Sequence, residues 1–489
     1  MALPNDPSMT WPPGEWGPVY DLYQEHAAWY SGSPERLSDV YSARAYTPTP
    51  RGRFWATDIQ KERRTMLHIP VAGDIAATSA DLLFSEPPKF FIPEGDAGER
   101  DAIEAQGRLE ALVDEGGLLN RLVEGAETAA AMGGVFIGPV WDDSVADYPI
   151  LRVVQADAAV PEFRWGILQA VTLWRVVEDD GEVVWRHLER HEPGVILHGL
   201  YVGDATTLGR RVDLNSHAET QGLQDSVELP PSMANTLAIR YVPNMRPNRR
   251  FRGQAIGQSD YSGAEGMMDA LDEVWTSWLR DIRLGRARLI VPEEYLQRSG
   301  DDFAFDIDQE IWSPLDMAPT DGQGITESQF TIRTEEHAKT AADLLERIVA
   351  AAGYSPQSFG LQIMGRAESG VALRIRERKS LTTKQKKERF WSSNLNDVLE
   401  QMLIIDREVF GRPTPLYRPR VQFEDSITPD PREVAESVEL VARAKAASVE
   451  TRVRMLHPDW SREEVEAEVE SILAEEGMRV PDMFQVGMP

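Results

Sequence analysis

Residues 331–380 read TIRTEEHAKT AADLLERIVA AAGYSPQSFG LQIMGRAESG VALRIRERKS, and this stretch decides the fold. Over 331–352, apolar residues recur at helical spacing behind a face of charged residues, a pattern that predicts an amphipathic helix. Gly353 accepts a left-handed cap and Pro356 cannot continue a helix, so the helix is predicted to stop between them.

A loop and a second, much longer helix follow. The loop, residues 357–368, carries apolar residues between Gly360 and Gly365. From Ser369 the helical pattern returns and continues to about Phe410, a length of roughly 60 Å at about 1.5 Å per residue. Two long helices joined by an apolar, glycine-flanked loop are too extended to enclose one compact pocket. They indicate a subunit of a larger assembly.

Length and composition predict a globular chain of two to four domains. The chain has 489 residues, 42% hydrophobic and 27% charged, with a formal net charge of -29 and no cysteine. Such an acidic chain does not wrap nucleic acid by neutralising phosphates, although DNA can still pass nearby without being gripped. Disulfides and thiolate metal sites are excluded. Because neither a signal-peptide pattern nor a membrane-spanning apolar run is found, we expect a soluble protein.

The N-terminal part is predicted to be helical. Residues 1–50 are rich in Trp, Tyr and Pro, which favours an arm that packs on the body or on a neighbouring subunit. Helices are predicted at 73–84, stopped by a Glu-Pro-Pro sequence, and at 99–132, with a break at Gly116–Gly117.

Strand patterns replace helical ones from residue 135 to about 241. Asp180–Gly181 lies between two β-rich segments and predicts a hairpin, so we expect an antiparallel sheet and a separate subdomain here. A smaller β insertion is predicted at 287–327. Within it, Phe303 and Phe305 alternate with small or acidic residues, which is the period of a half-buried strand.

Two long helices bracket this β insertion. The first is predicted over Ser259–Arg286, with Ser259 as its N-cap, and the second is the helix over 331–352. After a proline-rich linker, the C-terminal part predicts two acidic helices at 431–448 and 461–476, the second ending at Gly477.

Two motifs that suggest binding chemistry are incomplete. Gly365–Gly370 has the glycine spacing of a phosphate loop, but Val371 and Ala372 replace the essential Lys and Ser/Thr. His187 and His191 have the spacing of a helical metal pair. They fall in a strand-rich stretch, where that spacing separates them by more than about 12 Å, so a structural role is favoured.

The acidic run Asp306–Glu310 lacks the glycine and the distal glutamate of a calcium loop, which favours an acidic strand face. No nucleophile elbow is present, and no spaced His accompanies a convincing nucleophile. We therefore expect no enzymatic activity, no cofactor and no metal site.

One segment is basic against the acidic whole. Between Arg374 and Arg389 there are eight cations and two anions, a local net charge of +6. Two interpretations stay open: a face that is solvated or pairs with acidic groups of a neighbouring subunit, and direct contact with DNA. The candidate contact residues are Arg374, Arg378, Lys379, Lys384, Lys386 and Lys387.

Several segments between roughly residues 60 and 410 occur in a specific order and spacing. They are Asp74–Ala76, Leu82–Phe84 and Glu86–Pro87, then Trp185, Ile196–Tyr201 and Val242–Asn244, then Gly257–Tyr261 with Leu271–Asp272, and finally Gly353–Pro356, Phe359–Gly360 and Lys379–Ser380. By the order and spacing of these segments, the chain resembles the portal proteins of long-tailed double-stranded DNA bacteriophages, which form the ring at the head-to-tail vertex.

The resemblance implies a mainly helical α+β portal fold with wing, stem, clip and crown regions, which assembles as a ring. The implied regions are an N-terminal arm and α+β wing (1–256), a first stem helix (257–286), a β-rich clip (287–327), a second stem helix (328–353), a tunnel loop (354–368), a long wing helix with its linker (369–424) and a helical crown (425–489).

The resemblance also implies a function. The family forms a dodecameric ring at one capsid vertex, and its channel carries double-stranded DNA in during packaging and out during ejection. The implied partners are the terminase large subunit and later a head-completion adaptor, both docking on the clip, together with the major capsid and scaffold proteins. The implied location is the virion, with the host cytoplasm during assembly and no membrane.

Particular residues follow from these regions. The implied DNA-facing residues of the tunnel loop are Phe359, Leu361, Gln362, Ile363, Met364 and Arg366. The implied docking residues of the clip are Phe303, Phe305, Asp306, Asp308 and Trp312.

Three other protein classes compete with this interpretation. Another ring-forming head–tail connector or adaptor would lack the helix–β insertion–helix order. A nuclease or packaging ATPase would need an acidic metal cluster or a phosphate-loop lysine, and an ATPase assay separates it. A monomeric binding protein would be exposed by size-exclusion chromatography.

Overall fold

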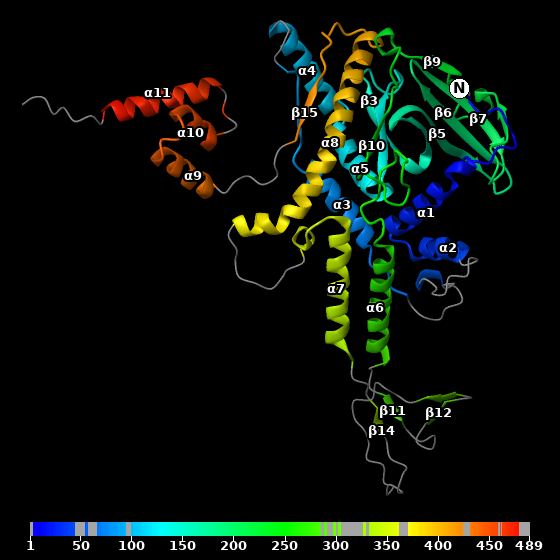
Figure 1. Ribbon diagram of the computed structural model, residues 1–489. Helices are drawn as coiled ribbons and strands as arrows, with labels where there is room; N and C mark the ends of the chain where they lie inside the picture. Colours follow the sequence, from blue (N-terminus) through cyan, green and yellow to red (C-terminus); the bar gives the residue numbers. More distant parts are fainter. Residues whose placement is uncertain are drawn as a thin grey trace, which may run out of the picture. The chain divides into compact units, whose positions relative to one another are not determined.

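The computed structural model describes most of the chain, which Figure 1 shows as a ribbon. The described residues are 3–44, 54–56, 66–93, 99–284, 288–290, 297–299, 302–304, 326–328, 332–360, 370–423, 431–457, 460 and 462–478. The chain divides into two compact units. The first comprises Met1–Arg366 and Ile375–Phe423, and the second comprises Ala367–Arg374 and Glu424–Pro489.

The described part of the chain contains both α-helices and β-strands. The helices are α1 (Gly17–Ser31), α2 (Pro34–Arg44), α3 (Val71–Phe84), α4 (Glu99–Glu115), α5 (Leu118–Met132), α6 (Glu265–Leu284), α7 (Thr334–Ala352), α8 (Gly370–Glu408), α9 (Pro431–Arg443), α10 (Val449–Leu456) and α11 (Arg462–Met478). The strands are β1 (Lys89–Phe91), β2 (Gly134–Val140), β3 (Ile150–Gln155), β4 (Ala159–Arg164), β5 (Ile167–Asp179), β6 (Val184–Glu192), β7 (Val195–Gly203), β8 (Arg210–Val212), β9 (Ser226–Glu228), β10 (Arg240–Pro243), β11 (Arg288–Ile290), β12 (Gln297–Ser299), β13 (Asp302–Ala304), β14 (Thr326–Ser328) and β15 (Arg420–Gln422).

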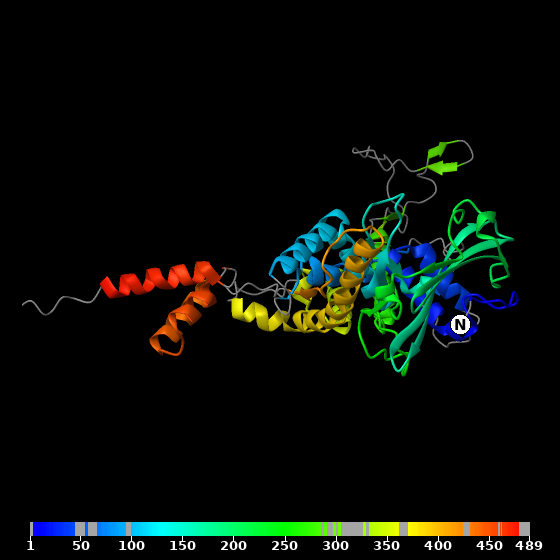
Figure 2. The ribbon, with the colours of Figure 1, turned by 90° about the horizontal axis from the view of Figure 1, so that it is seen from above.

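The largest sheet is antiparallel, in the order β4-β5-β6-β7-β8, with β9 also paired to β7. The predicted hairpin at Asp180–Gly181 is confirmed: it joins β5 to β6, and Gly181 takes the left-handed conformation that the tight turn requires (φ +89°). This sheet belongs to the first unit together with the helices beside it (Figure 2). The prediction of a separate β subdomain is therefore wrong.

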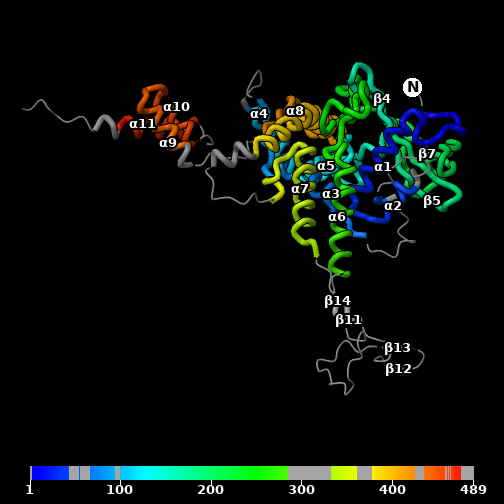
Figure 3. Tube along the Cα trace, turned by 60° about the horizontal axis from the view of Figure 1, so that its bottom comes forward, coloured from blue at the N-terminus to red at the C-terminus, as the bar shows by residue number. Residues whose placement is uncertain are grey.

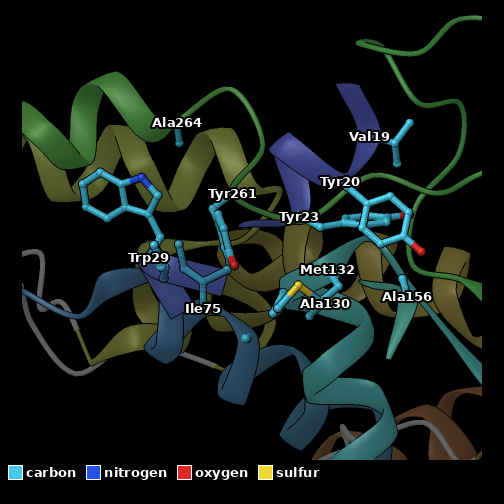
Figure 4. Close-up of a cluster of buried hydrophobic side chains, with 14 of the residues drawn as sticks. Val19, Tyr20, Tyr23, Trp29, Ile75, Ala130, Met132, Ala156, Tyr261 and Ala264 are labelled. Atoms are coloured by element: carbon cyan, nitrogen blue, oxygen red, sulfur yellow. The ribbon is translucent and has the colours of Figure 1, made fainter. Parts of the chain in front are cut away.

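A first core lies where α1, α3 and α5 meet the chain before α6 (Figure 4). Trp29 of α1 is fully buried beside Ile75 of α3, and Met132 of α5 belongs to the same cluster. Tyr261 is also fully buried, and its hydroxyl donates a hydrogen bond to the His26 carbonyl oxygen at 2.9 Å. The aromatic N-terminal segment thus packs on the body, as its composition predicted.

A second core is closed by α8. Its buried residues include Trp391 and Leu395 of α8, Leu122 of α5 and Leu109 of α4. The ring of Trp391 meets that of Phe84 edge to face, with 5.2 Å between their centroids. The predicted break in the 99–132 helix is confirmed, because α4 and α5 are separate helices.

Helices α6 and α7 lie side by side, and the β11/β14 and β12/β13 pairs lie between them in the sequence (Figures 1 and 3). The predicted order of helix, β insertion and helix is therefore confirmed. However, α6 begins at Glu265, later than predicted from Ser259. Residues 259–263 form a tight turn instead, in which Gly263 is left-handed (φ +93°).

The second unit contains α9, α10 and α11. The predicted helix over 431–448 ends early, at Arg443, and a short helix that was not predicted follows, with Ser448 capping it through the backbone N–H of Thr451. The prediction that Gly477 ends the last helix is wrong, because α11 continues through it.

Candidate functional site

A buried polar cluster lies where α6, α7 and α8 approach one another. It is centred on Lys387 of α8, whose side chain is 1% exposed, and on Asp260, whose side chain is 0% exposed. The Lys387 ammonium group donates to Asp260 Oδ2 at 2.6 Å, to Ser79 Oγ at 2.6 Å and to the Tyr354 hydroxyl at 2.9 Å. We call these residues, with Asn244, the junction cluster.

Each group of the junction cluster comes from a different element. Ser79 lies in α3, Tyr354 follows the Gly353 cap of α7, and Asn244 follows β10. Tyr354 donates to Asp260 Oδ2 at 2.7 Å, and the Asn244 amide donates to Asp260 Oδ1 at 2.7 Å. The cluster therefore fixes the bases of α6 and α7 against α3, α8 and the sheet that contains β10.

Burial and the charge of Asp260 shift the pKa values of two residues in the junction cluster. Burial lowers the pKa of Lys387, while the Asp260 carboxylate opposes that shift. Burial also raises the pKa of Tyr354, and the charge of Asp260 adds to this effect. The prediction that Lys387 contacts DNA or a neighbouring subunit is wrong, because its charge is neutralised inside the same chain.

The helical periodicity of α8 explains why Lys387 is buried. Ser380, Lys384, Lys387, Trp391 and Leu395 recur at intervals of three or four residues, and all are 5% exposed or less. They form the stripe of α8 that faces the core. Because Trp391 and Leu395 are apolar and lie on the same side of the helix as Lys387, the helical spacing could have predicted that Lys387 is buried. A count of charges along the segment could not.

Lys384 is a second correction within the predicted basic helix. Its side chain is 5% exposed, and its ammonium group lies 3.7 Å from Glu388 Oε1, one turn further along α8. It is therefore held by a pair within its own helix. Arg374 lies in α8 at a position where only the backbone is described.

Three other candidate contact residues of the predicted basic helix, Arg378, Lys379 and Lys386, line an open cleft of about 880 Å³ that Asp260 of the junction cluster also lines. Arg246 and Arg249, in the turn after β10, line the same cleft. Among the described residues that line this cleft, Asp260 supplies the only carboxylate, and that carboxylate already pairs with Lys387. The basic cleft is defined by the cationic residues Arg246, Arg249, Arg378, Lys379 and Lys386.

Most cations of the basic cleft have no acidic partner in the described part of the chain. The side chains of all five residues are exposed. Lys379 donates to the carbonyl oxygen of Ala350 and so caps the C-terminal end of α7. Within the described residues, the other four form no ion pair, although the whole chain carries a net charge of -29.

The structure describes only one of the predicted tunnel-loop residues. Phe359 is half-buried and packs against Tyr354, with ring centroids 6.0 Å apart, so it belongs to the core margin rather than to a free loop tip. The other predicted residues lie outside the described residues: Leu361, Gln362, Ile363, Met364 and Arg366.

The structure describes only one of the predicted docking residues of the clip. Phe303 lies in β13, opposite Arg298 of β12. The other predicted docking residues lie outside the described residues: Phe305, Asp306, Asp308 and Trp312.

A second buried carboxylate, Asp272 of α6, was not predicted as important. Its Oδ2 accepts from the indole N–H of Trp55 at 3.0 Å and lies 2.7 Å from His68 Nδ1, while its Oδ1 accepts from the Ile69 N–H at 2.8 Å. The neighbouring Thr276 hydroxyl accepts from the Leu67 N–H at 2.9 Å. These bonds hold two N-terminal segments against α6.

The two histidines of the candidate pair make different contacts within the large sheet. His187 and His191 lie on β6, where His187 stacks on His198 of β7 with ring centroids 5.3 Å apart, while His191 contacts Glu189 at 2.7 Å. The guanidinium of Arg152 holds the same Glu189 carboxylate at 2.8 Å. No group of three or more His, Asp or Glu side chains suited to a metal ion occurs among the described residues.

The histidine stack predicts a loss of stability in mild acid. Burial, aided by the nearby His198, lowers the pKa of His187 to about 4 from its ordinary 6.5. Because the unfolded chain then binds the proton more tightly, stability is complete above about pH 6.5 and falls until about pH 4. His187 alone is expected to remove about 1.3 kcal/mol of unfolding free energy between about pH 7.5 and pH 5.5, measured by urea titration.

A matched pair of variants tests this origin. His187→Phe should flatten the pH dependence, whereas Val176→Ala, at an exposed residue of β5 that does not titrate, should leave it unchanged. Equal slopes for His187→Phe and the unchanged protein would assign the pH dependence to other groups.

Comparison with known proteins gives little. No family model and no curated protein matches the sequence. The similar solved structures include a chain from "Neck of empty GTA particle computed with C6 symmetry", with a TM-score of 0.43 and 14% sequence identity over 79% of this chain and 90% of that chain. None of the described helices is long and apolar enough to cross a membrane. The proposed function therefore rests on the residues and geometry of this chain.

Proposed function

We propose that the chain is the subunit of a portal ring, the head-to-tail connector of a double-stranded DNA bacteriophage. The observation that carries the proposal is the paired α6 and α7, separated in sequence by two β pairs and followed by the 39-residue α8. In this assignment α6 and α7 are the stem, the β pairs belong to the clip, and α8 is the long wing helix. Helices α9, α10 and α11 form the crown in this assignment.

The surface of the stem supports assembly with further copies. Toward the end of α6 the apolar residues are not fully covered: Ile282 is 45% exposed, and the stacked Trp275 and Trp278 are half-buried. The parts of these side chains that α7 and the first core leave uncovered form an apolar strip that faces water in a single copy of the described chain. A ring in which neighbouring stems pack side by side would bury it, which is the usual reason for such a surface.

The charge of the chain suits a DNA channel. A net charge of -29 repels phosphate, so a duplex can slide through an acidic lumen without being trapped. In this proposal the ring is dodecameric and sits at one capsid vertex, and the terminase and then a head-completion adaptor dock on the clip. Capsid and scaffold proteins surround the ring. The chain itself needs no enzymatic activity.

We expect the purified protein to form rings with a central channel and about a dozen subunits. Negative-stain electron microscopy, with class averages inspected for rotational symmetry, and mass photometry measure this directly. As a control, Ile282→Glu should weaken ring formation, whereas Ile103→Glu, at a residue of α4 that is 67% exposed, should not. A protein that stays monomeric at every concentration, or that turns over ATP, would exclude the portal assignment.

A second candidate is a ring-forming connector or adaptor with no role in DNA translocation. The same exposed strip on α6 supports this candidate, because the strip indicates ring assembly but gives no indication of DNA translocation. In vitro packaging with purified rings separates the two candidates. Rings that support packaging are portals, whereas rings that join filled heads but never support packaging are adaptors.

A further inference from the structure

We infer that the basic cleft is a docking site for carboxylate side chains of a second copy of this chain. The inference rests on the proposed ring and adds to it the chemistry of one contact between subunits. Four exposed cations, Arg246, Arg249, Arg378 and Lys386, line the basic cleft without an acidic partner in the described part of the chain. These cations can therefore form ion pairs with carboxylates of another molecule.

The basic cleft is preorganised by its surroundings. Buried Asn248 donates to the Gly257 carbonyl oxygen at 2.6 Å, and its own side-chain oxygen accepts from two backbone N–H groups of the same turn. This turn presents Arg246 and Arg249. Arg378 and Lys386 stand two turns apart on α8, about 12 Å along the helix. The backbone of the turn and of α8 therefore presents these cations to one cleft, where bound carboxylates can neutralise them.

A second copy of the chain is the partner that fits this surface. With 80 acidic and 51 basic Lys and Arg residues, two copies repel overall, so a ring needs local contacts of opposite charge. A cyclic ring joins two different surfaces of neighbouring subunits, which lets one be basic and the other acidic. Duplex DNA fits less well, because its phosphates lie on a convex surface and would leave the floor of the concave cleft unfilled.

Charge reversal on α8 tests the inference with a matched control. In Arg378→Glu/Lys386→Glu two cations of the cleft are reversed, and in Arg389→Glu/Arg407→Glu two exposed arginines of the same helix that lie outside the cleft are reversed. Mass photometry should show that the cleft variant needs at least about tenfold more protein for half-assembly, while the control stays within about twofold of the unchanged protein. Raising the salt to about 1 M should narrow the difference in assembly between the unchanged protein and the cleft variant, because salt screens the cleft contact that only the unchanged protein makes.

A second measurement identifies the partner directly. Isotope-labelled and unlabelled protein are mixed, assembled and treated with a zero-length carbodiimide cross-linker, which joins an amine to a carboxylate in contact. The inference expects mixed-isotope cross-links from Lys386 to an Asp or Glu of another copy. This readout does not depend on whether a variant folds.

Each other outcome overturns the inference in a distinct way. If the cleft variant assembles normally but loses binding to duplex DNA in fluorescence anisotropy, the cleft is a nucleic-acid site. If it assembles and binds like the control, the cations are merely solvated. If the unchanged protein forms no ring at all, the proposed function fails together with the inference.

Discussion

Lys387→Met is expected to lower the unfolding free energy of the protein by about 3–5 kcal/mol. Methionine keeps the length of the side chain but removes the cation, which leaves the Asp260 carboxylate buried with only neutral donors from Tyr354 and Asn244. An uncompensated buried charge has a large desolvation cost, whereas the same truncation at the surface has almost none. Urea titration followed by tryptophan fluorescence measures the loss.

The neighbouring lysine provides the control. Lys386 is exposed on the same helix, so Lys386→Met should change the unfolding free energy by less than about 0.5 kcal/mol. The double variant Lys387→Met/Asp260→Asn should recover part of the loss, because it removes both charges together. A loss below about 1 kcal/mol for Lys387→Met would mean that the pair is not charged in the folded protein.

Asp272→Ala is expected to lower the unfolding free energy by about 3–4 kcal/mol, because two buried donors, the Trp55 indole and the Ile69 backbone N–H, lose their acceptor. His68 loses its carboxylate contact as well. We also expect faster hydrogen exchange at the Ile69 amide, which hydrogen-exchange mass spectrometry measures on the peptide that contains it.

A carboxylate further along α6 serves as the comparison. Asp281 is more exposed and pairs with Arg333, whose side chain is 66% exposed, so Asp281→Ala should cost less than about 1 kcal/mol. It should leave exchange at Ile69 unchanged. Equal effects of the two substitutions would show that the N-terminal segments are not held through Asp272.

The fold could be predicted where the signals are local. Gly353 ends α7 with a left-handed φ of +98°, and Gly181 makes the β5–β6 turn, so both breaks were visible as single residues. The start of α6 was not, because Ser259 has the side chain of an N-cap but lies in a tight turn. Its neighbours Asp260 and Tyr261 are used in buried contacts with distant segments, and such contacts override a capping preference.

The junction cluster could not be predicted from local pattern. Lys387 and Ser79 are 308 residues apart in the sequence, so neither neighbourhood indicates the other. The excess of positive charge around Arg378 and Lys386 was visible in the sequence. What it could not show is that Arg246 and Arg249 from a distant turn join them in one cleft.

The 308 residues between Ser79 and Lys387 also delay the completion of the junction cluster during synthesis. A ribosome adds roughly 5–20 residues per second, so Ser79 of α3 emerges on the order of tens of seconds before Lys387. During that interval Phe84, which α8 later covers through Trp391, has no partner from that helix. The nascent N-terminal part therefore presents an unfinished apolar face, a surface prone to aggregation, until translation has passed residue 391.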